Sequence, residues 1–164
     1  MSNTSIDHVT VRTGLTFDGL VSAFEAQLGR LDPDLVTSLV KAQAPWSEVK
    51  AAIERVAGPH GLMIIATANQ GAVTSLSGKP KRCVLYIVGN PLIASDIIDI
   101  DRAASFYVPF RIAVYESADD GTGVIAYDRP FSFLAALGRD ELKPFGALLD
   151  GKVDALLAAV TKAN

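Results

Sequence analysis

Gly89-Asn90-Pro91 is the sharpest chemical signal in the sequence. Asn is a preferred N-cap and Pro is favoured at the first helical position, so the tripeptide predicts the start of a helix. The backbone N–H groups at such a start point outward and can receive an anion. Lys79, Lys81 and Arg82 lie close in the sequence, which suggests a phosphate or carboxylate site. A helix that simply begins there explains the same residues, and both interpretations stay open.

A second group of candidate binding residues lies in two later segments that read as strands. Alternation from Phe110 onward puts Arg111 and Tyr115 on the same strand face, where they can wall a polar ligand group. Tyr127 belongs to the following strand, and a buried Tyr hydroxyl needs a hydrogen-bond partner. The predicted ligand-binding residues are therefore Gly89, Asn90, Pro91, Arg111, Tyr115 and Tyr127.

Nucleophiles, bases and metal ligands lack a convincing setting in this sequence. The candidates are His8, His60, Cys83, Asp96, Asp99 and Asp101. Cationic neighbours can activate a thiol, but a buried cysteine is usually inert packing. The aspartates can hold a hard cation, but a solvated helix face explains their spacing as well. We predict no catalytic residue and no metal ligand, and the sequence leaves the cofactor unknown.

The surrounding residues predict a chain of strands and helices. Alternating or continuous apolar runs predict strands near residues 8–12, 62–66, 83–88, 110–115 and 124–127, the first one ending at Gly14. Apolar residues at helical spacing predict helices near 17–28, 33–40, 46–56, 92–100 and 145–160. Asp and Gly at 118–121 predict a hairpin turn, and residues 69–78 stay unassigned.

The order of these elements predicts an α+β fold. It lacks the regular strand–helix alternation of a parallel doubly wound sheet, so a mainly antiparallel sheet with helices packed on it fits better. The runs 62–66 and 83–88 are apolar throughout, and we expect both strands to be covered on both faces.

Composition limits the class of protein. The 164 residues suit one domain over 1–164, and 49% hydrophobic against 20% charged residues excludes a disordered chain. A net charge of −3 with scattered cations argues against a nucleic-acid partner. No apolar run approaches the roughly 20 residues of a membrane span. With one cysteine and no signal-like start, we expect a cytoplasmic protein without a membrane partner.

Several blocks together carry a family resemblance. They are Leu76-Ser77-Gly78, Val84 to Pro91, Val108 to Glu116, and Ala126-Tyr127-Asp128-Arg129-Pro130. In order and spacing they resemble the bacterial domain-of-unknown-function family 302, best over residues 61–131. The resemblance implies a TATA-binding-protein-like α+β fold with about five strands, often as a dimer. The shared positions would be Gly89, Asn90, Pro91, Pro109 and Tyr127, and the helical segment near residues 30–57 is an addition.

Three functions remain open at this point. Our first hypothesis is a non-catalytic module that binds a small, largely apolar ligand with one polar or anionic end. The second is an enzyme that uses Cys83, Tyr127 or an aspartate near the Gly89-Asn90-Pro91 turn. The third is a dimeric structural or interaction domain without a ligand, in which the partner covers the apolar strands.

Overall fold

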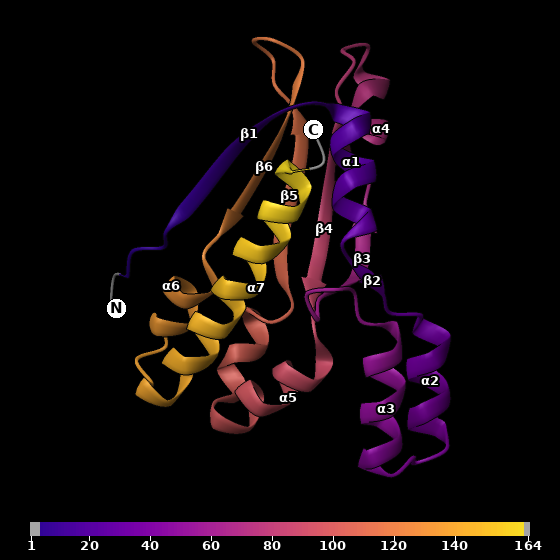
Figure 1. The fold of residues 1–164 in the computed structure, drawn as a ribbon, viewed down its shortest axis with the longest axis vertical. Coiled ribbons are helices and arrows are strands. Elements are labelled where there is room, and N and C mark those ends of the chain that lie inside the picture. Colours follow the sequence, from indigo (N-terminus) through magenta and orange to yellow (C-terminus); the bar gives the residue numbers. More distant parts are fainter. Residues whose placement is uncertain (1–3, 163–164) are drawn as a thin grey trace.

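One mainly antiparallel sheet organises the chain in the computed structural model, which describes residues 4–162 (Figure 1). The strands lie in the order β1-β6-β5-β4-β3-β2, and among neighbours only β2 and β3 run parallel. Their bounds are β1 (His8–Thr16), β2 (Gly29–Arg30), β3 (Met63–Ala68), β4 (Cys83–Gly89), β5 (Phe110–Glu116) and β6 (Thr122–Asp128). The fold is α+β, as the sequence predicts, and the sheet has six strands within residues 4–162, where about five were expected.

The helices alternate irregularly with these strands. They are α1 (Phe17–Ala26), α2 (Pro33–Lys41), α3 (Trp46–Val56), α4 (Gln70–Thr74), α5 (Pro91–Ile100), α6 (Pro130–Ala135) and α7 (Lys143–Thr161), with 3-10 turns at Ser75–Ser77, Arg102–Phe106 and Asp140–Leu142. Figure 1 shows α1 and α7 in front of the sheet, α5 and α6 near its lower end, and α2 and α3 extending away from the strands. The helical segment expected near residues 30–57 is thus the pair α2 and α3.

The core lies between the sheet and the helices that cross it. On β4 the side chains of Val84, Tyr86 and Val88 are buried, and they pair across the sheet with the buried residues Val114, Ile112 and Phe110. The Tyr86 ring packs on Phe24 of α1 with centroids 5.0 Å apart. Its hydroxyl donates to Glu25 Oε1 at 2.8 Å, so the phenol is both buried and satisfied.

The opposite face of the sheet remains in contact with solvent, which corrects the expectation of strands covered on both faces. On β4 the alternate side chains Cys83, Leu85 and Ile87 are only half-buried. On β3 the residues Ala66 and Ala68, which pair with Ile87 and Leu85, are exposed. An apolar run over so few residues cannot by itself tell a strand covered on two faces from one covered on a single face. We call this surface the open face.

Local capping chemistry explains why the helices begin where they do. Thr16 accepts a hydrogen bond from the Gly19 N–H and starts α1, and Asp32 accepts from the Asp34 N–H and starts α2. Residues 69–78, unassigned from the sequence, form α4 and a 3-10 turn, with Asn69 capping α4. The hairpin turn at 118–121 is confirmed, with Gly121 at φ 73°.

One strand boundary differs from the sequence prediction, and two short elements were not predicted. Strand β1 continues through Gly14 to Thr16, because Gly14 adopts φ 73° and the pairing register shifts there instead of ending. The two-residue strand β2 and the short helix α6 were both missed. Neither is long enough to show a hydrophobic period.

Within residues 4–162, none of the helices combines the length and apolarity needed to cross a bilayer.

Candidate functional site

The Gly89-Asn90-Pro91 turn joins β4 to α5, as the sequence predicts. Asn90 Oδ1 accepts from the Leu92 N–H at 2.9 Å, and Asn90 Nδ2 donates to the Gly61 carbonyl at 2.8 Å. Pro91 has no N–H to satisfy, and the Ala94 N–H already donates to the Asn90 carbonyl. The Asn90 side chain therefore caps the helix and ties it to the loop after α3.

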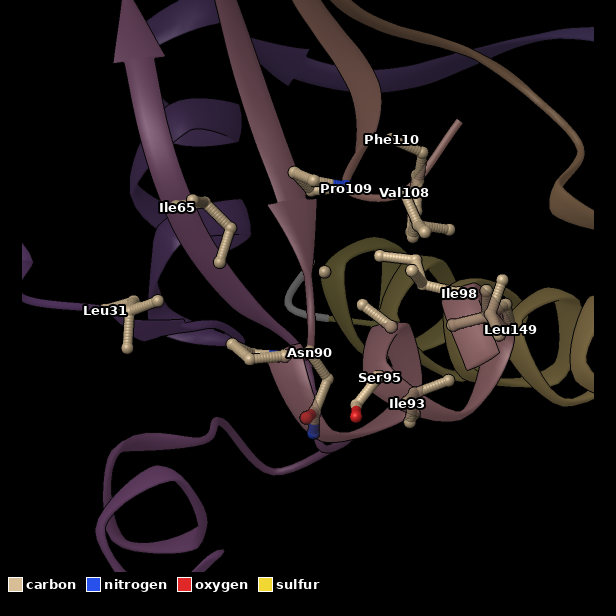
Figure 2. Close-up of a pocket in the computed structure, with 14 residues that line it drawn as sticks. Leu31, Ile65, Asn90, Ile93, Ser95, Ile98, Val108, Pro109, Phe110 and Leu149 are labelled. Carbon is tan, nitrogen blue, oxygen red and sulfur yellow. The ribbon is translucent and has the colours of Figure 1, made fainter. Parts of the chain in front are cut away.

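A cavity of about 310 Å³ lies against this turn (Figure 2). We call it the α5 pocket; its lining is Leu31, Ile65, Gly89, Asn90, Pro91, Ile93, Ala94, Ser95, Ile97, Ile98, Val108, Pro109, Phe110 and Leu149. Leu31 and Leu149 lie at opposite ends of the pocket in Figure 2. The lining is apolar except for Asn90 and Ser95, so the pocket suits a small, mostly hydrocarbon molecule.

Close backbone packing shapes one wall of the pocket. A Cβ at Gly89 would lie 3.1 Å from Pro109 Cβ and 3.4 Å from Pro109 Cα. Glycine lets the end of β4 approach the segment that leads into β5, and this brings both segments into the same wall.

Ser95 supplies the free polar atom of the α5 pocket. Within residues 4–162 the Ser95 side chain takes part in no intramolecular hydrogen bond, whereas both ends of the Asn90 amide are engaged. Figure 2 draws the Ser95 hydroxyl at the lower edge of the pocket. A hydroxyl can both donate and accept, so this edge can bind an uncharged polar group.

The cations that suggested an anion site lie at the other end of β4. That strand has seven residues, so its ends are roughly 20 Å apart. Arg82 pairs with Asp18 and Glu116 and lies over the Phe17 ring. The Lys81 ammonium donates to the carbonyls of Thr74 and Lys79 and to the Ser77 hydroxyl. The lining of the α5 pocket contains no charged side chain.

Arg111 and Tyr115 share one strand face, as predicted, but that face is the open face. Arg111 pairs across the sheet with Ile87, and Tyr115 pairs with Cys83. Arg111 lines a separate cavity of about 480 Å³, the Arg111 pocket, with Ile6, Ile87, Phe106, Tyr107, Pro109, Phe110, Asp128 and Phe133. The two pockets share Pro109 and Phe110, which stand between Arg111 and the α5 pocket.

Tyr127 lines neither the α5 pocket nor the Arg111 pocket. It faces the helices, pairs with Ile112, and is 4% exposed within the core. Burial raises the pKa of the Tyr127 phenol, and the nearby Arg129 opposes that shift only in part. The structure thus brings Gly89, Asn90 and Pro91 together and separates Arg111, Tyr115 and Tyr127 from them.

The residues considered for catalysis are also apart. His8 Nδ1 lies 2.8 Å from Asp128 Oδ1 on the sheet edge, and His60 Nε2 lies 3.1 Å from Gln27 Oε1. Cys83 is half-buried on the open face. Within residues 4–162 the structure contains no group of three or more His, Cys, Asp or Glu side chains that could hold a metal ion.

Several lining residues were not foreseen from the sequence. Leu31, Ile65 and Leu149 come from a loop, from β3 and from α7, and only the folded sheet brings them together. Ile93 and Ile98 could have been found, because their helical spacing on α5 already marked an apolar face.

Comparison with known proteins agrees with this fold. Residues 38–160 match the family described as "Domain of unknown function DUF302". The chain belongs to the DUF302 family. It is similar in structure to an uncharacterized conserved DUF302 protein from Bacillus stearothermophilus, with a TM-score of 0.66, 16% identity, and coverage of 95% of this chain and 99% of that one. No curated protein matches the sequence. Because the identity is only 16%, this structural similarity shows that the two proteins share a fold and nothing more.

Proposed function

We propose that this DUF302 domain is a non-catalytic module that binds a small, uncharged, largely apolar molecule in the α5 pocket. The observation that carries the proposal is a concave apolar lining that meets a single free hydroxyl, that of Ser95, beside the Gly89-Asn90-Pro91 turn. Ligand sites commonly combine such a lining with few polar groups. The volume of about 310 Å³ is at the small end of known ligand pockets.

The absence of charged side chains from the lining of the α5 pocket favours a neutral ligand. A carboxylate or phosphate buried against this lining would lose its hydration without meeting a cation. An alcohol, an aldehyde or an ester can instead pair with the Ser95 hydroxyl. The ligand therefore keeps the polar end expected from the sequence, but that end is uncharged and not anionic.

A filled pocket tests this proposal. Ala94→Phe places a ring in the α5 pocket from a helical position, and Ala158→Phe places the same ring on an exposed position of α7 outside the pocket lining. We expect 1-octanol to raise the melting temperature of the wild type and of Ala158→Phe, but not of Ala94→Phe. Native mass spectrometry of freshly purified protein should detect any ligand carried from the cell on the wild type and on Ala158→Phe, but not on Ala94→Phe. Equal stabilisation of all three proteins by 1-octanol would remove the α5 pocket as the binding site.

A second candidate is a homodimer formed through the open face. The half-buried apolar side chains of β4 and the neighbouring Ala113, Tyr115 and Ala126 leave a hydrocarbon surface that a second copy can cover. Leu85→Lys lies at the centre of this face, and light scattering should show a dimer for the wild type and a monomer for the variant. A monomeric wild type at high concentration would reject this role.

We also propose that the domain acts in the cytoplasm. Its sequence has one cysteine, Cys83, which the fold keeps as a free thiol. Fractionation of cells with an antibody against the native protein tests this, and recovery in an extracytoplasmic fraction would contradict it.

A further inference from the structure

A second apolar cavity lies between α2 and α3. It measures about 370 Å³, and we call it the hairpin groove; its lining is Leu31, Val36, Leu39, Val40, Gln43, Ala44, Trp46, Val49, Ile53 and Pro91. Gln43, in the turn between the helices, is the one polar side chain of that lining. The groove therefore has the same hydrocarbon character as the α5 pocket.

The two helices leave this surface open. Helix α2 has a well-formed N-terminus, with Asp32 as its cap and Pro33 at its first turn, yet none of its residues is buried. Val40 is 70% exposed and Trp46 is 49% exposed, although both line the groove. A helix normally turns such a stripe toward the core. Here the stripe faces a cavity that the chain itself does not fill.

The hairpin groove adjoins the α5 pocket. Leu31 and Pro91 line both cavities, so one boundary separates them, and neither lining contains a charged side chain. A flexible hydrocarbon chain that crosses between Leu31 and Pro91 would lie in both cavities. A helix of another protein is roughly 10–12 Å wide and can cover only the outer groove.

We propose that the two cavities form one binding site for a long, unbranched aliphatic chain with an uncharged polar head. The inference rests on the proposed function and specifies its ligand class. The head lies in the α5 pocket near Ser95, the chain passes Leu31 and Pro91, and the tail lies between α2 and α3. The hairpin of α2 and α3 is then the part of the domain that selects chain length.

A series of primary alcohols from hexanol to dodecanol tests the length of the site. Each methylene that leaves water for an apolar site contributes a factor of about four in affinity. The dissociation constants, measured by calorimetry, should keep falling by about this factor after the α5 pocket is full. A plateau at the shorter members would confine the ligand to the α5 pocket and overturn the inference.

Trp46 reports directly on the groove, because it is the one tryptophan in the sequence and lines that cavity. Dodecanol should shift its emission to shorter wavelength, and a dodecanol with bromine on the terminal carbon should quench it. Hexanol should do neither, because it ends within the α5 pocket. Binding of dodecanol without any change in Trp46 emission would overturn the inference.

A matched pair of variants separates the groove from general effects. Val40→Lys places an ammonium in the hairpin groove, whereas Val73→Lys changes a residue of the same type and the same 70% exposure outside it. We expect Val40→Lys to weaken dodecanol binding at least tenfold and to leave hexanol binding unchanged. Val73→Lys should bind both alcohols like the wild type.

The possible failures are distinguishable. If hexanol does not bind the wild type, the proposed function fails and the inference fails with it. If hexanol binds and Val40→Lys leaves dodecanol affinity unaltered, the inference alone fails. If Trp46 emission instead shifts with protein concentration and Val40→Lys stops self-association, the groove is an interface between copies, which also overturns the inference.

Discussion

The two ends of β4 differ in chemistry although one short strand contains both. At the Cys83 end, Arg82 is held by Asp18 and Glu116, and Lys81 is held by carbonyl oxygens. At the Gly89 end, the α5 pocket presents hydrocarbon and one free hydroxyl. Cations that are a few residues from a helix N-terminus in the sequence therefore cannot contact an anion bound there when an extended strand lies between them. Distance along a strand grows by about 3.3 Å per residue.

The largest effect on stability is expected from Gly89→Val at the pocket end. Its Cβ would lie 3.1 Å from Pro109 Cβ, which is already a tight contact, and valine adds two methyl groups beyond that atom. Overpacking of this kind costs about 1–3 kcal/mol of unfolding free energy. Urea denaturation followed by circular dichroism measures the loss. Ala66→Val adds two methyl groups at an exposed position of β3 and should change stability little, so equal midpoints for the two variants would contradict the packing account.

A somewhat smaller effect is expected from Asn90→Ala. The change removes both the cap on the Leu92 N–H and the bond to the Gly61 carbonyl, which together stabilise the fold by about 1–2 kcal/mol. Asn69→Ala is the matched change near the Cys83 end, because Asn69 caps α4 through the Ala72 N–H alone and is exposed. Thermal unfolding should rank Asn90→Ala as the more destabilising variant. The reverse order would show that the Asn90 bonds matter less than the structure implies.

Tyr86→Phe tests the middle of β4, between the two ends. The hydroxyl donates to Glu25, and its removal should cost about 1 kcal/mol at neutral pH. Burial raises the pKa of the Tyr86 phenol above its usual value of 10.0, and the bond to Glu25 adds to the rise. Above about pH 10 the unfolded chain loses this proton while the folded chain keeps it, so stability falls as the pH rises. Urea denaturation from pH 8 to pH 11 should show a shallower fall for Tyr86→Phe than for the wild type. Parallel curves of stability against pH for the two proteins would contradict a raised pKa of the Tyr86 phenol.

The smallest effect is expected from Arg82→Gln at the charged end. Its ion pairs are solvent-exposed, so the change should alter stability only slightly, and less at high salt than at low salt. Binding of 1-octanol should be unchanged, because β4 separates Arg82 from the α5 pocket. Loss of 1-octanol binding in Arg82→Gln would show that the two ends of β4 are coupled.

Local chemistry made much of the fold predictable. Thr16, Asp32 and Asn90 each cap a helix through a backbone N–H two or three residues away, so the sequence around each cap contains the whole signal. Strand β5 was equally clear, because Phe110, Ile112 and Val114 alternate with more exposed residues.

The parts that were missed depend on distant contacts. Strand β2 exists because Gly29 and Arg30 meet Met63 and Ile64, and two residues have no detectable period. The α5 pocket needs Leu31 and Leu149 in one place, and no linear spacing relates them. The distance of Arg111 from that pocket likewise follows from which strand face it occupies and from the position of Pro109.

The central claim is that the pocket at the Gly89 end of β4 receives a neutral apolar ligand. Calorimetric titration of the wild type with 1-octanol and with octanoate tests it most directly, because the two differ mainly in charge. The account predicts that 1-octanol binds at least about tenfold more tightly, since a buried carboxylate would find no cation in the lining. Octanoate binding as tightly as 1-octanol, and losing that affinity in Arg111→Met, would contradict it and move the site to the Arg111 pocket.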